Sequence, residues 1–202
     1  MQEEKGGWVY FLSNRPNGTL YVAWGNRTGD PASGHANILL TKSTNGGLTW
    51  SAPVVAGDVS GRSAYFASVA TDPSSNVNVV FNAMDDVPTG TAPGAGVVHY
   101  DAYVTRSTNG GASFSSPLLI STVTSDPDGS STNSLGAQFL GDYITAIADG
   151  AHVYAVWTDS RNATPCAAVD AFRAGTGPKP NVITQCPNTF GNTDIFLGIV
   201  TP

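Results

Sequence analysis

STNGGLTW, residues 43–50, returns with small changes as STNGGASF at residues 107–114. The flanks of the two copies also correspond: GTLYVAW and HANILLTKS precede the first copy, while SNVNVVF and HYDAYVTRS precede the second. Near the C-terminus, ADGAHVYAVWTDSR and TDIFLGIV repeat the flanks but are not followed by a third copy of the turn. A fixed spacing of 64 residues between equivalent turns indicates a repeat architecture.

Apolar residues alternate along each repeat, which predicts β-strands. Leu20, Val22 and Trp24 share one face of such a strand. Counting the runs gives four strands in a repeat; in the second repeat they are YFASVATD, VNVVFNAM, DAYVTRS and SPLLIST. Four antiparallel strands in every repeat are typical of a β-propeller blade. A β-sandwich is the alternative, but it gives no reason for the same hairpin at a fixed period.

The repeated turn contains the residue types that a tight hairpin requires. Asn45 can accept backbone N–H bonds and close an Asx-type turn, and Gly47 permits a positive φ angle. Ser43 can hydrogen-bond across the turn, and Trp50 can pack into the seam of the sheet. We therefore expect both turns to be structural. The residues with this role are Ser43, Asn45, Gly47, Trp50, Ser107, Asn109, Gly111 and Phe114.

Both turns fit the Asp-box pattern Ser/Thr-x-Asp/Asn-x-Gly-x-Thr/Ser-Trp/Phe, so the chain resembles the sialidase-like propellers with bacterial neuraminidase (BNR) repeats. The resemblance implies an all-β, sialidase-like β-propeller. The 202 residues would supply about three of the family's six blades, in one domain, with blades near 7–57 and 63–123 and a partial blade at 138–202. A second copy of the chain (a homodimer) or missing sequence would complete the ring. GGWVYFL (6–12), from this chain or a partner, could add the missing strand of the last blade.

Composition and charge narrow the possible partners. The net charge is -6 and basic residues form no run, which argues against nucleic acid and anionic membrane surfaces. No apolar stretch approaches the roughly 18 residues that span a bilayer. Cys166 and Cys186 flank a loop rich in Pro, Gly and Ala, and we predict a disulfide between them; two free thiols are the alternative. The disulfide and the few lysines suggest a bacterial-type secreted protein, extracellular or periplasmic.

The resemblance also implies a reaction, for which this sequence carries an incomplete set of residues. A retaining sialidase uses three arginines that clamp the sialate carboxylate, a Tyr nucleophile assisted by Glu, and an Asp acid/base. Here no Glu follows residue 4, and the family's Phe-Arg-Ile-Pro motif is absent. Sialidase activity by this chain alone is therefore not expected.

The polar residues of the third repeat form the best candidate site, because they stand at predicted strand ends. Strand ends on one side of a blade converge on the axial pocket of a propeller. The candidates for catalysis are Asp142, Tyr143 and Asp159, and those for ligand binding are Arg161, Asp194 and Arg62. The alternative is a buried carboxylate–arginine network that braces the blade.

A cation site is a further possibility in SDPDGSSTN (125–133). Asp126 and Asp128 stand beside Gly129 as at the start of a Ca²⁺ loop. The later acidic ligands are missing, which favours an ordinary Asx turn, and no other cofactor is indicated.

Two functions remain open. The first is an extracellular propeller that binds a glycan or another small polar ligand, or serves as a scaffold, through its axial pocket. The second is a sialidase-like glycoside hydrolase whose site another chain or missing blades complete, with Asp142 or Asp159 as acid/base. Two carboxylates about 5–9 Å apart across a pocket would favour hydrolysis. Carboxylates held by Arg161 would favour the binding or structural role.

Overall fold

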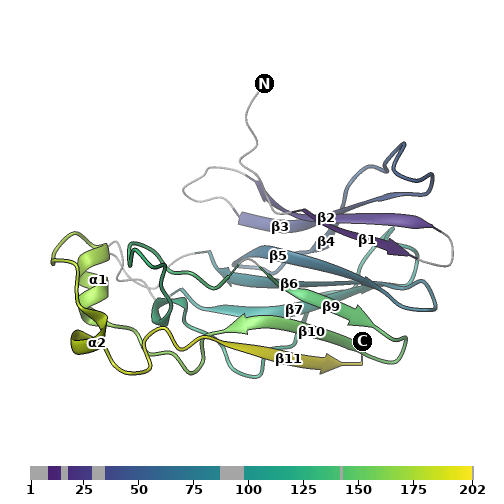
Figure 1. The fold of residues 1–202 in the computed structure, drawn as a ribbon. Coiled ribbons are helices and arrows are strands. Elements are labelled where there is room, and N and C mark those ends of the chain that lie inside the picture. Colours follow the sequence, from purple (N-terminus) through teal and green to yellow (C-terminus); the bar gives the residue numbers. More distant parts are fainter. Residues whose placement is uncertain (1–8, 15–17, 29–34, 87–97, 142, 202) are drawn as a thin grey trace.

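The computed structural model describes residues 9–14, 18–28, 35–86, 98–141 and 143–201. The described residues form three antiparallel sheets that lie side by side (Figure 1). The strands of the first sheet, in order, are β1 (Val9–Asn14), β2 (Thr19–Thr28), β3 (His35–Ser43) and β4 (Val54–Gly57). Each strand pairs with the next along the chain, so the sheet is a meander of the kind that forms a propeller blade.

The second and third sheets repeat this order. The second contains β5 (Arg62–Thr71), β6 (Val77–Asp85), β7 (Tyr100–Ser107) and β8 (Leu118–Leu119). The third contains β9 (Thr145–Ala148), β10 (Val153–Asp159) and β11 (Asp194–Val200). We call these sheets blades 1, 2 and 3. The prediction of an all-β propeller with about three blades is confirmed.

Two hydrophobic cores join the blades because the strands of blade 2 are apolar on both faces. Val77, Val79 and Phe81 of β6 pack against blade 1 in the first core. Val80 of the same strand belongs to the second core, together with Trp157 of blade 3. A strand covered on both faces reads as a continuous apolar run rather than an alternating one. Blade 2 is therefore the middle layer of the molecule.

The antiparallel order places the functional loops together. The first strands of the blades, β1, β5 and β9, are neighbours in space and mark the axial side. The starts of β5 and β9, the ends of β6 and β10, and the starts of β7 and β11 all lie at one end of the sheets. We call this the loop end. The repeated turns at 43–50 and 107–114 lie at the opposite end.

The N-terminal strand corrects one expectation. Phe11 and Leu12 of the GGWVYFL segment pair with Val22 and Tyr21, so β1 is the first strand of blade 1. A short connection to β2 favours this local hairpin over pairing with a distant blade. The proposal that this segment of the same chain completes blade 3 is therefore wrong for the residues that the structure describes.

A helical insertion follows β10. The connection to β11 contains α1 (Ala167–Arg173) and α2 (Val182–Gln185), and a disulfide joins Cys166 to Cys186 with 5.2 Å between the Cα atoms. The predicted disulfide is confirmed. Val169 is the buried centre of a small separate core here, so the cross-link supplements limited packing with roughly 3 kcal/mol. No described helix is long and apolar enough to cross a membrane.

Candidate functional site

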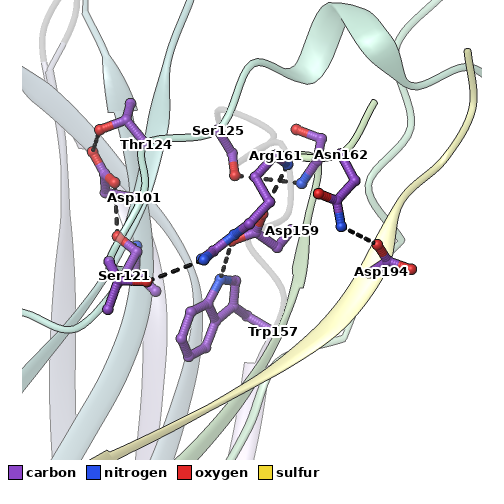
Figure 2. Close-up of polar contacts among 12 residues, drawn as sticks. Asp101, Ser121, Thr124, Ser125, Trp157, Asp159, Arg161, Asn162 and Asp194 are labelled. Carbon is purple, nitrogen blue, oxygen red and sulfur yellow. Dashed lines mark hydrogen bonds and ion pairs between the residues drawn. The ribbon is translucent and has the colours of Figure 1, made fainter. Parts of the chain in front are cut away.

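Asp159 and Arg161 form a closed ion pair at the end of β10 (Figure 2). Arg161 Nε donates to one carboxylate oxygen of Asp159 at 2.9 Å, and Nη2 donates to the other at 2.7 Å. The Asp159 side chain is 0% exposed, and the guanidinium lies 3.9 Å from the ring centre of Phe196. Burial alone would raise the pKa of Asp159, but the hydrogen bonds from Arg161 outweigh it and lower the pKa.

The pair therefore has the geometry of the bracing network. Trp157 Nε1 also donates to Asp159 (3.3 Å), and Arg161 Nη1 donates to Thr122 Oγ1 (3.0 Å) in the connection before β9. A general acid/base must reach a substrate, whereas this carboxylate is enclosed by its own blade. The structure thus leaves Asp159 without the access that its predicted catalytic role requires, and it engages Arg161 internally.

Arg62 is held in the same way in blade 2. Its Nε lies 3.0 Å from Asp85 Oδ1, and its Nη1 donates to Asp101 Oδ2 at 2.6 Å. Asp101 is almost fully buried and also accepts from Ser121 (2.7 Å) and Thr124 (3.2 Å), as Figure 2 shows. Arg62 thus ties the first strand of blade 2 to its second and third strands.

The remaining candidates do not join these pairs. Asp194 opens β11 and accepts from Asn162 Nδ2 at 2.8 Å, away from the guanidinium of Arg161 (Figure 2). Tyr143 precedes β9 and is 83% exposed. Asp142 lies outside the described residues. The five candidates that the structure describes therefore do not form one cluster: the Asp159–Arg161 pair, Arg62, Asp194 and Tyr143 have separate surroundings.

A pocket of about 370 Å³ lies at the loop end, beside the first strand of blade 2. Tyr65 and Phe66 of β5 form one wall, and Phe139 and Gly141 belong to the connection that leads to β9. Phe139 is 50% exposed. Because β5 lies on the axial side of its blade, this is the pocket that best fits the predicted axial position.

The backbone of β5 is irregular where it meets the pocket. The pairing with β6 shifts register between Tyr65 and Ser68, and Phe66 has a φ of 49°. A β-bulge re-aims side chains and is frequent beside functional sites, and a positive φ is strained for a bulky aromatic residue. The bulge allows both Tyr65 and Phe66 to line the pocket.

The hydroxyl of Tyr65 stays neutral behind this wall. It is buried without a hydrogen-bond partner among the described residues. Burial, with smaller contributions from Tyr100 and Asp101, raises its pKa well above the ordinary value. Tyr65 is therefore not activated as a nucleophile.

The polar wall of the pocket is fixed by the helical insertion. Gln138 Nε2 donates to Asp128 Oδ1, and both residues line the pocket. Arg173 of α1 lies 3.9 Å from the same oxygen and donates to the carbonyl of Ser130 (2.7 Å) and that of Leu135 (3.2 Å). These bonds hold the 128–138 segment against the insertion, so the disulfide-linked lobe supports one wall of the pocket.

The possible Ca²⁺ loop has a different role. Asp126 caps the 3₁₀ turn η1 (Pro127–Gly129) by accepting from the backbone N–H of Asp128 at 2.8 Å. Among the described residues, no group of three His, Cys, Asp or Glu side chains could hold a metal ion. The geometry is that of an Asx turn.

Sequence reasoning missed most of the pocket. Tyr65, Phe66, Gln138 and Phe139 are not among the site residues that the sequence predicts, and Asp128 is predicted only as a possible Ca²⁺ ligand. The consecutive aromatics in YFAS are the one available signal, since adjacent strand residues normally point to opposite faces. The bulge that brings both to one cavity depends on pairing with β6, which the local sequence does not display.

Neither a family model nor a curated protein matches the sequence. Among solved structures, an α-L-arabinanase of Penicillium chrysogenum complexed with arabinobiose is similar, with a TM-score of 0.50 and 14% identity over 78% of this chain and 42% of that chain. A Hadza microbial sialidase gives a TM-score of 0.48 and 14% identity over 76% of this chain and 32% of that chain. A protein of unknown function from Dyadobacter fermentans gives a TM-score of 0.47 and 20% identity over 75% of this chain and 34% of that chain.

This chain therefore spans between 32% and 42% of the length of these three proteins. At such low identity, the arabinanase likeness is evidence of the fold alone, and it agrees with the repeated four-stranded meanders of blades 1 and 2. The fold of this chain is that of a partial β-propeller.

Proposed function

We propose that the chain is a secreted propeller that binds neutral oligosaccharides in the pocket between β5 and the 127–141 connection. The observation that carries the proposal is the lining of this pocket. Aromatic and apolar side chains form most of it, with a few fixed polar groups, which is the usual composition of a small-molecule site. The exposed Phe139 offers a flat face to a sugar ring, and Asp128 and Gln138 can bond its hydroxyls.

The charge of the pocket favours neutral ligands. Among the described residues that line it, none is Arg or Lys, and Asp128 contributes a negative charge. Arg62 and Arg161, the two arginines predicted to bind a ligand, are engaged with carboxylates of their own blades. A sialylated glycan would bring its carboxylate to Asp128, and Arg173 beside Asp128 is not among the described residues that line the pocket, so this glycan should bind more weakly than a neutral one.

Binding has more support than hydrolysis. Glycoside hydrolysis normally requires two carboxyl groups that flank the scissile bond. Among the described lining residues, Asp128 carries the one carboxylate, and it is held by Gln138 with Arg173 nearby. The proposed compartment is extracellular or periplasmic, because a disulfide persists in an oxidising environment.

The test is a binding screen with neutral and sialylated oligosaccharides, followed by titration of the best ligand. Phe139→Ala should weaken binding about tenfold or more, since it removes the aromatic platform. Leu119→Ala is the matched control, because Leu119 is 51% exposed on the outer strand β8, away from the pocket. Its affinity should equal that of the unchanged chain.

Three results would contradict the proposal. They are an absence of binding in the neutral set, tighter binding of sialylated glycans, and equal effects of Phe139→Ala and Leu119→Ala. Release of free sugar from the bound oligosaccharide would replace binding with hydrolysis as the function.

A further inference from the structure

Blade 3 exposes an apolar sheet face whose equivalents in the other blades are buried. In blade 1, Ile38 and Leu40 of β3 are covered by blade 2. Ala102 and Val104 occupy the same places in blade 2 and are covered by blade 3. The residues at these places in β11 are Ile195 and Leu197, which are 71% and 58% exposed. We call the face that packs on the next blade the trailing face.

The trailing face of blade 3 continues beyond these two residues. Ile199 is also exposed on β11, and Ile147 of β9 is exposed on the same side. Exposed apolar patches of this kind mark interaction sites in soluble proteins. In the described residues, β11 also has one unpaired edge, which natural proteins normally cover.

Blade 1 also has an uncovered face, on the side opposite to its trailing face. We call the face that packs on the preceding blade the leading face. Val77 and Phe81 of blade 2 are fully buried against blade 1, and Trp157 of blade 3 is buried against blade 2. The equivalent residues of blade 1 are Leu20 and Trp24, and both remain partly exposed. Among the described residues, no blade covers this face.

The repeated turns show how a leading face engages a trailing face. In the second turn, a Cβ atom on Gly111 would lie 3.2 Å from Leu40 of blade 1, and Lys42 Nζ of blade 1 donates to the Gly110 carbonyl at 2.6 Å. The second turn thus sits on the third strand of the preceding blade. The first turn carries the same STNGG residues, yet Trp50 is 40% exposed, and a Cβ atom on Gly47 would meet Leu20 and Trp50 of its own blade.

We infer that the trailing face of blade 3 binds the leading face and first turn of blade 1 from a second copy of the chain. The described chain presents one unpaired face of each kind, and the packing inside it shows that the two kinds fit. Two copies related by a two-fold axis bury both faces in two identical contacts and close a six-bladed ring. The first strands β1, β5 and β9 of each copy then line half of the axis.

The internal repeat predicts which atoms meet. Leu197 takes the place of Leu40 and packs on Gly47 of the partner copy. Ile199 takes the place of Lys42, so Ile199→Lys would direct an ammonium to the Gly46 carbonyl of that copy. Comparing lysine at these two positions separates specific packing between blades from non-specific hydrophobic association. Lysine is expected to be tolerated at 199 and excluded at 197, two residues away on the same face.

The test measures the mass of the 202-residue chain by sedimentation equilibrium over a range of concentrations. We expect twice the 20.8 kDa of one chain. Leu197→Lys should raise the dimer dissociation constant by roughly 100-fold or more, because the side chain is lost from both contacts. Ile199→Lys should leave it within about tenfold. Leu119→Lys, a change of similar exposure on β8, should have no effect.

Hydrogen exchange of the unchanged chain gives a second reading that does not depend on any variant. Amides of residues 46–50 and 194–200 should exchange more slowly as concentration rises, while those of 110–114, covered within one chain, should not change. A folded monomer at every concentration would overturn the inference, as would a dimer that Leu197→Lys leaves intact or that Leu119→Lys dissociates. The inference is independent of the glycan proposal, since mass and exchange are measured without ligand.

Discussion

The two repeated turns share most of their internal hydrogen bonds but have different surroundings. In the first turn, Ser43 Oγ accepts from the N–H of Gly47 at 2.9 Å, and Asn45 Oδ1 accepts from the N–H of Thr49 at 2.9 Å. The second turn reproduces these bonds at 2.8 and 3.0 Å. The second turn packs on blade 1, whereas the first packs on its own blade.

The comparison separates local from tertiary contributions. Eight residues are sufficient to close the hairpin, because its donors and acceptors lie within the turn. What the hairpin adds to stability depends on the blade beneath it, which the eight residues do not specify. The variants below test this separation in a Leu197→Lys background, so that no second copy covers the first turn.

The largest difference is expected between Gly111→Ala and Gly47→Ala. Gly111 has a φ of 77° and Gly47 a φ of 89°, so both changes place a side chain in the left-handed region at about 1–2 kcal/mol. At Gly111 the new methyl group also lies 3.2 Å from Leu40 and Tyr21, whereas at Gly47 the nearest atom is 3.7 Å away.

We therefore expect losses in the free energy of unfolding of about 3 kcal/mol for Gly111→Ala and about 1 kcal/mol for Gly47→Ala. Urea titration measures both. Equal losses would mean that the surroundings of the turns do not matter.

Ser107→Ala and Ser43→Ala should have equal effects of intermediate size. Both hydroxyls are buried, and each donates to the Asn of its own turn at 2.8 and 2.9 Å respectively. Each change leaves a glycine N–H unpaired and should cost about 1.5 kcal/mol. A difference well above about 0.5 kcal/mol in urea titration would show that the hydrogen bonds of the turn also depend on tertiary packing.

Lys42→Met should produce a smaller and localised effect. Its ammonium donates to Gly110 across the interface of blades 1 and 2, and its loss should cost about 1 kcal/mol. Hydrogen exchange should become faster in residues 110–114 and stay unchanged in residues 46–50. Faster exchange in both turns would contradict a specific bond between the blades.

The smallest effect on stability is expected from a change of pH, which acts on His35 at the loop end of the interface between blades 1 and 2. His35 Nε2 lies 2.7 Å from Asp58, and Nδ1 lies 2.8 Å from Asp86. These bonds, first that to Asp58 and then that to Asp86, raise the pKa of His35. Its contribution to stability is therefore fully present below the unfolded pKa of about 6.5 and is lost as pH rises through the folded pKa.

The midpoint of urea unfolding should fall between about pH 5 and about pH 9 because of this loss. The fall should be absent in His35→Gln. An unchanged pH dependence in that variant would assign the effect to another group. Because Lys42 and His35 lie at opposite ends of this interface, their contributions should be independent, and the Lys42→Met loss should be the same at both ends of this pH range.

The candidate site was less predictable than the fold. The sequence predicts Asp159 and Arg161 at the same strand end, but it does not predict that they are buried against each other as an ion pair. The presence of charged residues at a strand end does not reveal whether they form an ion pair with each other or remain accessible to a ligand. The pocket, in contrast, depends on Phe66 and Phe139, which come from segments far apart in the sequence.

By itself, the sequence determined the repeat, the hairpin turns, the all-β class and the disulfide, because each depends on short-range patterns of side chains or on a pair of cysteines. The tertiary structure alone decided which polar residues are buried, where the pocket lies and which blade faces are left uncovered. Those properties depend on packing between blades, and closely similar local sequences have different exposure when one has a neighbour and the other does not.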